Sequence, residues 1–154
     1  MSEVLEVFET SLAAIQADQH QAGEAVRPPA GSAATAGLIS EARAKLGVDV
    51  PEGYLAFLRA SDGIDYNGLV FYSAADTLET AEGGFWQGLV AANLTWRDDP
   101  ANNSLLVLGD SDLDVFVWTP ATATFAQMDR IGRDRMIPHS SCAAMIDAAL
   151  TARL

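Results

Sequence analysis

Apolar residues are densest between positions 104 and 128, where short hydrophobic runs alternate with polar turns. The run at 105–108 is apolar at every position, a pattern typical of a strand covered on both faces. The following runs are separated by Gly, Asp, Ser and Pro, which indicates consecutive antiparallel strands. A similar run occurs earlier, after a turn at 65–68. The predicted strands are residues 69–72, 105–108, 114–118 and 124–128.

Apolar residues at helical spacing predict five helices around these strands. The first spans residues 2 to about 17 and begins with acidic residues, which the helix dipole favours there. The residues predicted to face the core from the five helices are Val4, Phe8, Leu12, Ile15, Leu38, Ile39, Ala42, Leu46, Tyr54, Phe57, Leu58, Phe85, Leu89, Ala92, Trp96, Cys142, Met145, Ile146, Ala149 and Leu150.

Start and stop signals set the bounds of three of these helices. Ser32 is predicted to cap the second helix, and Gly47 is predicted to end it in the left-handed conformation. Pro51 opens the third helix, where a missing N–H has no cost, and Gly63 closes it. Ser140 is predicted to cap the last helix.

The remaining segments are predicted as loops. Residues 19–31 contain a Pro-Pro pair and form a loop, a candidate mobile linker for the first helix. Residues 73–84 are irregular or partly helical, 97–103 form an exposed loop, and 130–138 are charged and irregular. Helices and strands are segregated along the chain rather than alternating, which favours an α+β fold over a doubly wound parallel sheet.

Length and composition predict one domain over residues 1–154. We expect an extra N-terminal helix at 1–18, a loop at 19–31 and a core at 32–154. No apolar run reaches the roughly 18 residues that a membrane span requires. The acidic N-terminus is unlike a signal peptide, and the single Cys142 fits a reducing compartment, so we expect a cytoplasmic protein. Cys142 is interpreted as a buried structural thiol.

The charge balance is strongly acidic: 9 Lys and Arg against 21 Asp and Glu give a net charge of −12. Phosphate-binding surfaces carry the opposite sign, so nucleic-acid binding is disfavoured. An acidic surplus attracts basic partners. The alternative is that the acidity only maintains solubility.

Asp110, Asp112 and Asp114 have the one-three-five spacing of a calcium loop. That loop also requires Gly at its sixth position and Glu at its twelfth, where this chain has Val115 and Ala121. The segment is therefore interpreted as a polar hairpin turn.

A Gly-Asp-Ser block contains Ser111, which resembles the nucleophile block of a lipase-esterase family. A hydrolase would need His139 as the base within hydrogen-bond reach, with a third group to orient it. The block lies late in the chain, and Asp134 precedes His139 at the wrong spacing. A Ser111 hydrolase is kept only as a second alternative.

The residue inventory disfavours metals and cofactors. With two histidines and one cysteine a zinc site is disfavoured, and no phosphate-binding Gly-rich motif is found. We predict no catalytic, metal-binding or cofactor-binding residues. Tyr66 and Trp86 lie near turns and are candidate exposed anchors for a partner.

Three blocks occur in one order and spacing that resembles a known family. The blocks are Leu46-Gly47-x-x-Val50-Pro51-x-x-Tyr54-x-x-Phe57-Leu58 followed by Asp62-Gly63; Asn67-Gly68-Leu69-Val70-Phe71-Tyr72; and Gly109-Asp110-Ser111-Asp112-x-Asp114-x-Phe116-Val117.

Together they resemble the SUKH superfamily over residues 38–150. The resemblance implies an α+β domain whose mixed, mainly antiparallel sheet is flanked by helices. Bacterial members are mostly non-enzymatic immunity proteins that neutralise polymorphic toxins by binding them. Other members are regulatory interaction modules, so an adaptor role is the first alternative. The family has no catalytic residue set to carry over.

The expected partner is therefore a protein, a basic toxin domain such as a nuclease, and the chain itself is expected to be a monomer or weak dimer. The residues predicted as partner contacts are Asp62, Asp65, Tyr66, Trp86, Asp110, Asp112 and Asp114.

Overall fold

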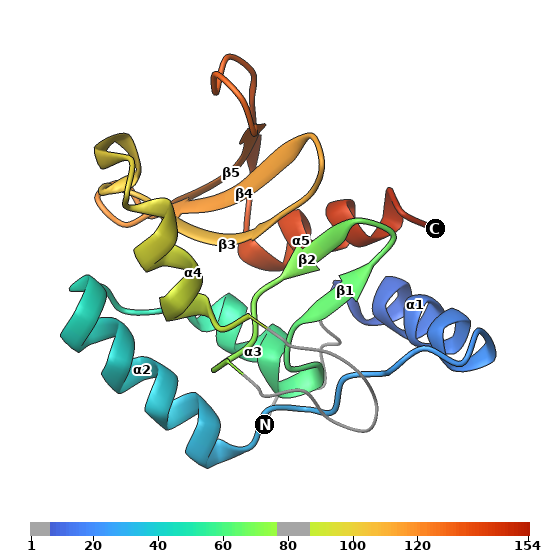
Figure 1. Cartoon of the computed structure of the whole chain (residues 1–154). Helices are drawn as coiled ribbons and strands as arrows, with labels where there is room; N and C mark the ends of the chain where they lie inside the picture. The colour runs from blue at the N-terminus through green and yellow to red at the C-terminus, as the bar shows by residue number, and fades with distance from the viewer. Residues whose placement is uncertain (1–6, 77–86) are drawn as a thin grey trace.

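Six strands form one sheet in the computed structural model, which describes residues 7–76 and 87–154 (Figure 1). The strands follow one another in the sheet in chain order, and every ladder between them is antiparallel. A single parallel bridge joins Ser73 to Gly88 outside the strands. The predicted α+β domain with a mainly antiparallel sheet is confirmed. The strands are β1 (Ile64–Tyr66), β2 (Leu69–Phe71), β3 (Leu106–Asp110), β4 (Asp114–Thr119), β5 (Thr124–Asp129) and β6 (Met136–His139).

The four predicted strands are confirmed as β2 to β5, but two strands were not predicted. β1 lies where a turn was expected at 65–68; the turn is reduced to Asn67 and Gly68, whose positive φ angles of 49° and 83° build a two-residue hairpin. β6 lies inside the segment predicted as irregular. It contains Pro138, which lacks an N–H donor and is tolerated because β6 is an edge strand.

β3 is the strand that is covered on both faces of the sheet. Leu106, Val107 and Leu108 have no exposed surface, as the apolar run predicts. Gly109 permits β2 to approach, because a Cβ atom there would lie 2.4 Å from the carbonyl oxygen of Val70. A register shift between Val107 and Gly109 marks a bulge against β4.

The five predicted helices are present with shifted bounds. They are α1 (Glu9–Gln21), α2 (Ser32–Leu46), α3 (Glu52–Ala60), α4 (Leu89–Trp96) and α5 (Cys142–Thr151), with a short 3-10 helix, η1 (Pro100–Asn102), inside the loop predicted at 97–103. That loop is only partly exposed, because Asn102 is buried and donates to the Trp96 carbonyl oxygen at 2.8 Å.

Several predicted helix ends were wrong by one to four residues. α1 extends to Gln21, so the loop predicted from residue 19 begins later; residues 2–6 of the predicted helix lie outside the described residues. Gly31 rather than Ser32 precedes α2, and Pro51 is the residue before α3 rather than its first. α3 ends at Ala60, three residues before Gly63.

Of two other predicted helix ends, one is confirmed and one was wrong by a residue. Gly47 does end α2 with φ 68°, as predicted. The cap of α5 is Ser141 instead of Ser140, and its hydroxyl accepts the Ala144 N–H at 3.0 Å.

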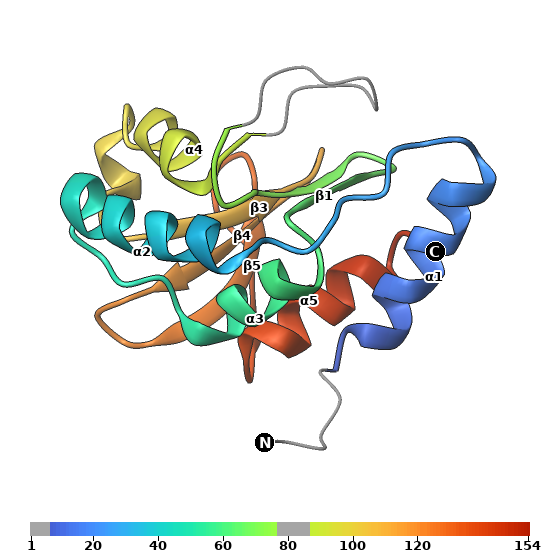
Figure 2. The same ribbon diagram turned by 90° about the horizontal axis from the view of Figure 1, so that it is seen from below.

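The helices cover opposite faces of the sheet (Figure 2). α3 and α5 lie on one face, where the rings of Phe57, Phe71 and Phe116 pack in sequence with centroid distances of 5.7 and 5.3 Å. α4 lies on the other face, and α2 packs against α4. Of the predicted core residues that are described, only Ile39 and Trp96 are not fully buried.

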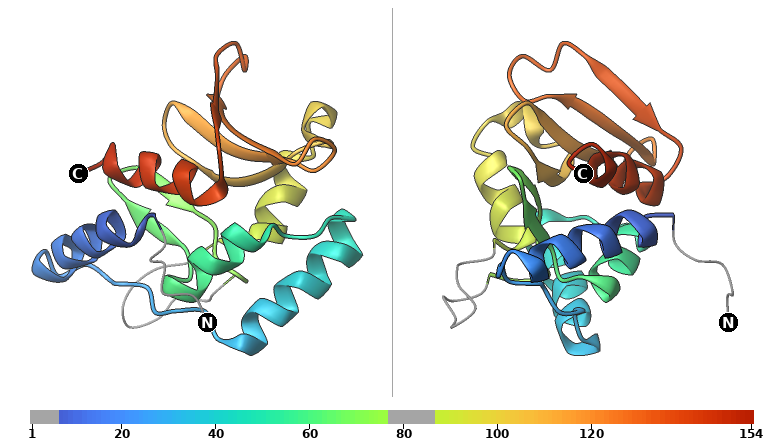
Figure 3. Two further views of the ribbon diagram at one scale, coloured as in Figure 1. Left: turned by 180° about the vertical axis from the view of Figure 1, so that it is seen from behind. Right: turned by 90° about the vertical axis from the view of Figure 1, so that its right-hand side faces the viewer.

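α1 packs against the rest of the domain and is not held by a mobile linker alone. It lies beside α5 (Figure 3), and the hydroxyl of Ser11 donates to Asp147 at 2.7 Å. Phe8 and Ile15 are fully buried. Among the described residues, none of the helices has the length and apolar character needed to cross a bilayer.

Candidate functional site

Ser111 and His139 do not form a catalytic pair. The hydroxyl of Ser111 is buried and accepts the N–H groups of Leu113 and Asp114 at 3.4 and 3.1 Å, so it stabilises the turn between β3 and β4. His139 pairs with Phe125, which pairs with Trp118, four residues along β4 from Asp114. At about 3.4 Å per residue, roughly 14 Å of strand lies between Asp114, next to the Ser111 turn, and Trp118, which is level with His139.

The three aspartates of the same hairpin point to different partners. Each carboxylate pairs with its own arginine, so the acidic hairpin is largely neutralised. The pairs are Asp110 with Arg130 at 2.8 Å, Asp112 with Arg153 at 3.2 Å and Asp114 with Arg135 at 3.1 Å. Among residues 7–76 and 87–154, no group of three or more His, Cys, Asp or Glu side chains is placed to hold a metal ion.

The other predicted contacts fall at separate places. Asp62 pairs with Arg27 at 3.2 Å and accepts the Ala74 N–H at 2.8 Å, so it ties loops together. Asp65 is exposed on β1. The expectation that Tyr66 is an exposed anchor was wrong: only 6% of it is exposed, because β1 turns it inward, and its hydroxyl donates to Asp18 at 2.5 Å. Trp86 lies outside the described residues.

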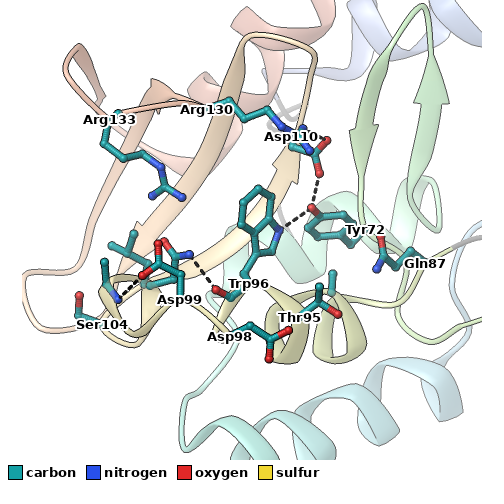
Figure 4. Close-up of a pocket in the computed structure, with 15 residues that line it drawn as sticks. Tyr72, Gln87, Thr95, Trp96, Asp98, Asp99, Ser104, Asp110, Arg130 and Arg133 are labelled. Carbon is teal, nitrogen blue, oxygen red and sulfur yellow. Dashed lines mark hydrogen bonds and ion pairs between the residues drawn. The ribbon is translucent and has the colours of Figure 1, made fainter.

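A cleft that the sequence did not indicate lies on the α4 side of the sheet. Its volume is about 960 Å³, and it opens between α4, η1, the end of β2 and the loop from β5 to β6 (Figure 4). Trp96, the last residue of α4, lies at its centre. This volume is within the range of ligand pockets.

A closed circuit of contacts holds the Trp96 ring in place. Its indole N–H donates to the Tyr72 hydroxyl at 2.9 Å, and that hydroxyl donates to Asp110. Asp110 in turn accepts from Arg130 at 2.8 Å, and the Arg130 guanidinium lies over the Trp96 ring, 5.5 Å from its centroid. Burial raises the pKa of Tyr72, and the neighbouring Asp110 charge raises it further, so the hydroxyl remains a donor.

Arg133 differs from the other cations of the chain. Its guanidinium lies 5.8 Å from the centroid of the Trp96 ring, but within the described chain it has no ion pair or hydrogen bond. Its backbone is left-handed, with φ 56°, directly after Gly132 with φ 81°. Where the chain leaves α4, Asp98 and Asp99 are exposed at the cleft, and neither forms an ion pair with a described residue.

No family model matches the chain, and a search of curated proteins also finds no match. The resemblance to the SUKH superfamily therefore stays a prediction.

The pH dependence of folding provides a test of the half-buried His139 ring. Its Nε2 atom is buried without a hydrogen-bond partner among the described residues, and burial lowers the pKa of His139. Between its folded pKa and its unfolded pKa of about 6.5, the unfolded chain binds a proton that the folded chain does not. We expect the free energy of unfolding, measured by urea titration, to fall as the pH drops below about 6.5, by well under the roughly 1.4 kcal/mol per pH unit of a fully buried group, because water still reaches part of the ring.

In the His139→Leu variant this part of the pH dependence should disappear. The exposed His20 is the matched control, so His20→Leu should retain it. Equal pH profiles for wild type and His139→Leu would contradict the argument.

Proposed function

We propose that this domain is a non-enzymatic binding protein whose partner is a basic protein domain. The Trp96 cleft supports this proposal most directly. Trp, Tyr and Arg are the residue types that dominate binding hot spots. Here Trp96 and Arg130 line the cleft, and Tyr72, which is itself buried, holds the Trp96 ring before any partner arrives, so little side-chain entropy would be lost on binding.

The charge distribution supports a basic partner. All nine Lys and Arg residues lie in the described ranges, and seven of them pair with carboxylates of the protein. Arg97 donates to the carbonyl oxygens of Leu46 and Leu105, and Arg133 lies on Trp96. Because the cations are mostly engaged within the fold, the surplus of carboxylates is left to face solvent and a basic surface.

The specific role that we propose is that of an immunity protein, which neutralises a cognate toxin by covering its functional surface. This role rests on the three sequence blocks that resemble the SUKH superfamily. A regulatory adaptor is the alternative, and it would bind its partner through the same kind of surface. Coexpression with the product of the adjacent gene separates the two, because only an immunity protein should rescue growth from a toxin.

Salt dependence is the test of the electrostatic part of the proposal. Purified protein is mixed with the toxin domain encoded by the adjacent gene, and the kinetics are measured at low and high salt. We expect the association rate to fall steeply as salt is added, because steering acts on encounter, while the dissociation rate changes less.

Ser111→Ala serves as a control in the same experiment, because Ser111 is buried in a turn and should not alter binding. Absence of binding at about micromolar concentration, a free energy weaker than about −8 kcal/mol, would reject this partner. Tight binding that is insensitive to salt would reject the electrostatic part alone.

A further inference from the structure

The Trp96 cleft carries charges of both signs that do not meet. Arg133 enters from the β5–β6 loop beside the Trp96 ring, and Asp98 and Asp99 line the same cleft where the chain leaves α4 (Figure 4). No ion pair joins Arg133 to either aspartate. Seven of the nine Lys and Arg side chains pair with a carboxylate of the protein. Arg133 lines the same cleft as two aspartates and pairs with neither, and this arrangement requires an explanation.

The backbone places Arg133 in this position at some cost. A non-glycine residue with φ 56° occupies the left-handed region, which costs about 1 kcal/mol or more. Gly132 takes the same region just before it, so the chain reverses and directs Arg133 back over the cleft while Ile131 projects into solvent, 88% exposed.

The position of Arg133 beside Trp96 suits one kind of ligand. The guanidinium carbon lies over the Trp96 ring, 5.8 Å from its centroid, and the N–H donors of the guanidinium lie in its plane, along its edge. That edge matches the two oxygens of a carboxylate, which it can bind in a bidentate way. Arg130 in the same cleft is already neutralised by Asp110 at 2.8 Å, so Arg133 is the cation left for a ligand.

A simple anion or a simple cation fits this cleft poorly. A lone carboxylate bound to Arg133 would be repelled by Asp98 and Asp99, and a lone cation bound to the two aspartates would be repelled by Arg133. A ligand that carries both signs, separated by a short spacer, avoids both repulsions. The apolar surface of Trp96 and Leu105 would cover the spacer.

We propose that the Trp96 cleft binds a peptide segment of the partner in which a basic and an acidic side chain lie close together. The acidic side chain pairs with Arg133, and the basic side chain lies at Asp98 and Asp99. The cleft volume of about 960 Å³ accommodates several residues of such a segment. This inference rests on the proposed binding function and identifies where on this chain the partner docks.

The test uses three capped tripeptides as probes: Arg-Gly-Glu, its Arg-Gly-Gln counterpart and its Gln-Gly-Glu counterpart. The full-length protein is titrated with each, and the NMR signal of the Trp96 indole N–H, assigned by its loss in Trp96→Phe, reports binding. We expect a saturable shift with Arg-Gly-Glu and an affinity lower by about tenfold for either probe that lacks one charge, the loss typical of one charge-assisted hydrogen bond.

Variants of the protein locate the two charges. Arg133→Gln should remove the preference for Glu over Gln in the probe. Arg133→Lys should not restore this preference fully, because an ammonium group cannot bind a carboxylate through two parallel N–H donors. Asp98→Asn combined with Asp99→Asn should remove the preference for Arg. Arg135→Gln is the matched control in the same loop, because Arg135 pairs with Asp114 and Asp129 and does not line the cleft.

Three results would overturn the inference. They are no saturable shift up to about 10 mM Arg-Gly-Glu, where a millimolar complex is largely formed; equal affinity for the three probes; and a preference that survives Arg133→Gln in a protein with an unchanged melting temperature. None of these results bears on whether the adjacent gene's product binds, and failure of that product to bind leaves the peptide result standing.

Discussion

The Val107→Asp variant is expected not to fold. Val107 lies at the centre of β3 with no exposed surface, and α4 covers its side of the sheet. A carboxylate there would be buried without a cation, because the surroundings of Val107 are apolar side chains and the Asn93 amide. An unpaired buried charge costs several kcal/mol even after relaxation, which is comparable with the whole stability of a domain, about 5–15 kcal/mol.

Circular dichroism and urea titration provide the measurement. We expect no cooperative unfolding transition for Val107→Asp. The same substitution at Val7, which is 59% exposed, is the matched control and should keep the transition near that of wild type. A folded Val107→Asp protein with a normal midpoint would show that β3 is not the covered central strand.

How far the sequence predicts the fold depends on how strongly each element is patterned. The run at 105–108 predicts β3 because a short, continuous apolar run between turn residues is typical of a strand covered on both faces. β6 was missed because its charged approach and Pro138 suppress the strand pattern, and only the pairing with β5 makes it a strand. β1 was missed because its three residues are too few to show alternation.

The sequence did not predict most of the candidate site, for a different reason. Helical spacing correctly places Trp96 on the inner side of α4, yet nothing local indicates that the loop after β5 folds back over it. Arg130, Arg133 and Asp110 are brought to Trp96 by the register of three strands, which is a tertiary property. The spacing of Asp110, Asp112 and Asp114 along the chain is that of a single calcium loop, but their side chains belong to three different ion pairs.

A single buried amide, Asn93 of α4, takes the place of a missing strand beside β3. β2 pairs with β3 only as far as Phe71 and the Tyr72 N–H, so the backbone of Val107 has no strand on that side. The Asn93 side chain fills the gap: its oxygen accepts the Val107 N–H, and its nitrogen donates to the Val107 carbonyl oxygen, both at 2.8 Å. The same nitrogen donates to the Leu89 carbonyl oxygen at 2.9 Å, so every hydrogen of the amide is used.

The Asn93→Leu variant should therefore be destabilised by about 2–6 kcal/mol, because two buried backbone groups lose their partners at once and each costs about 1–3 kcal/mol. Leucine has the same number and branching of side-chain heavy atoms as asparagine, so no cavity is left and the loss would come from the unpaired groups. The exposed Asn103 provides the matched control, and Asn103→Leu should change the free energy of unfolding by less than about 0.5 kcal/mol.

Hydrogen exchange at the Val107 amide separates the mechanism from general destabilisation. That amide should exchange faster in Asn93→Leu than its neighbours in β3, whereas a uniform change along the strand would mean that the amide of Asn93 does not replace a strand.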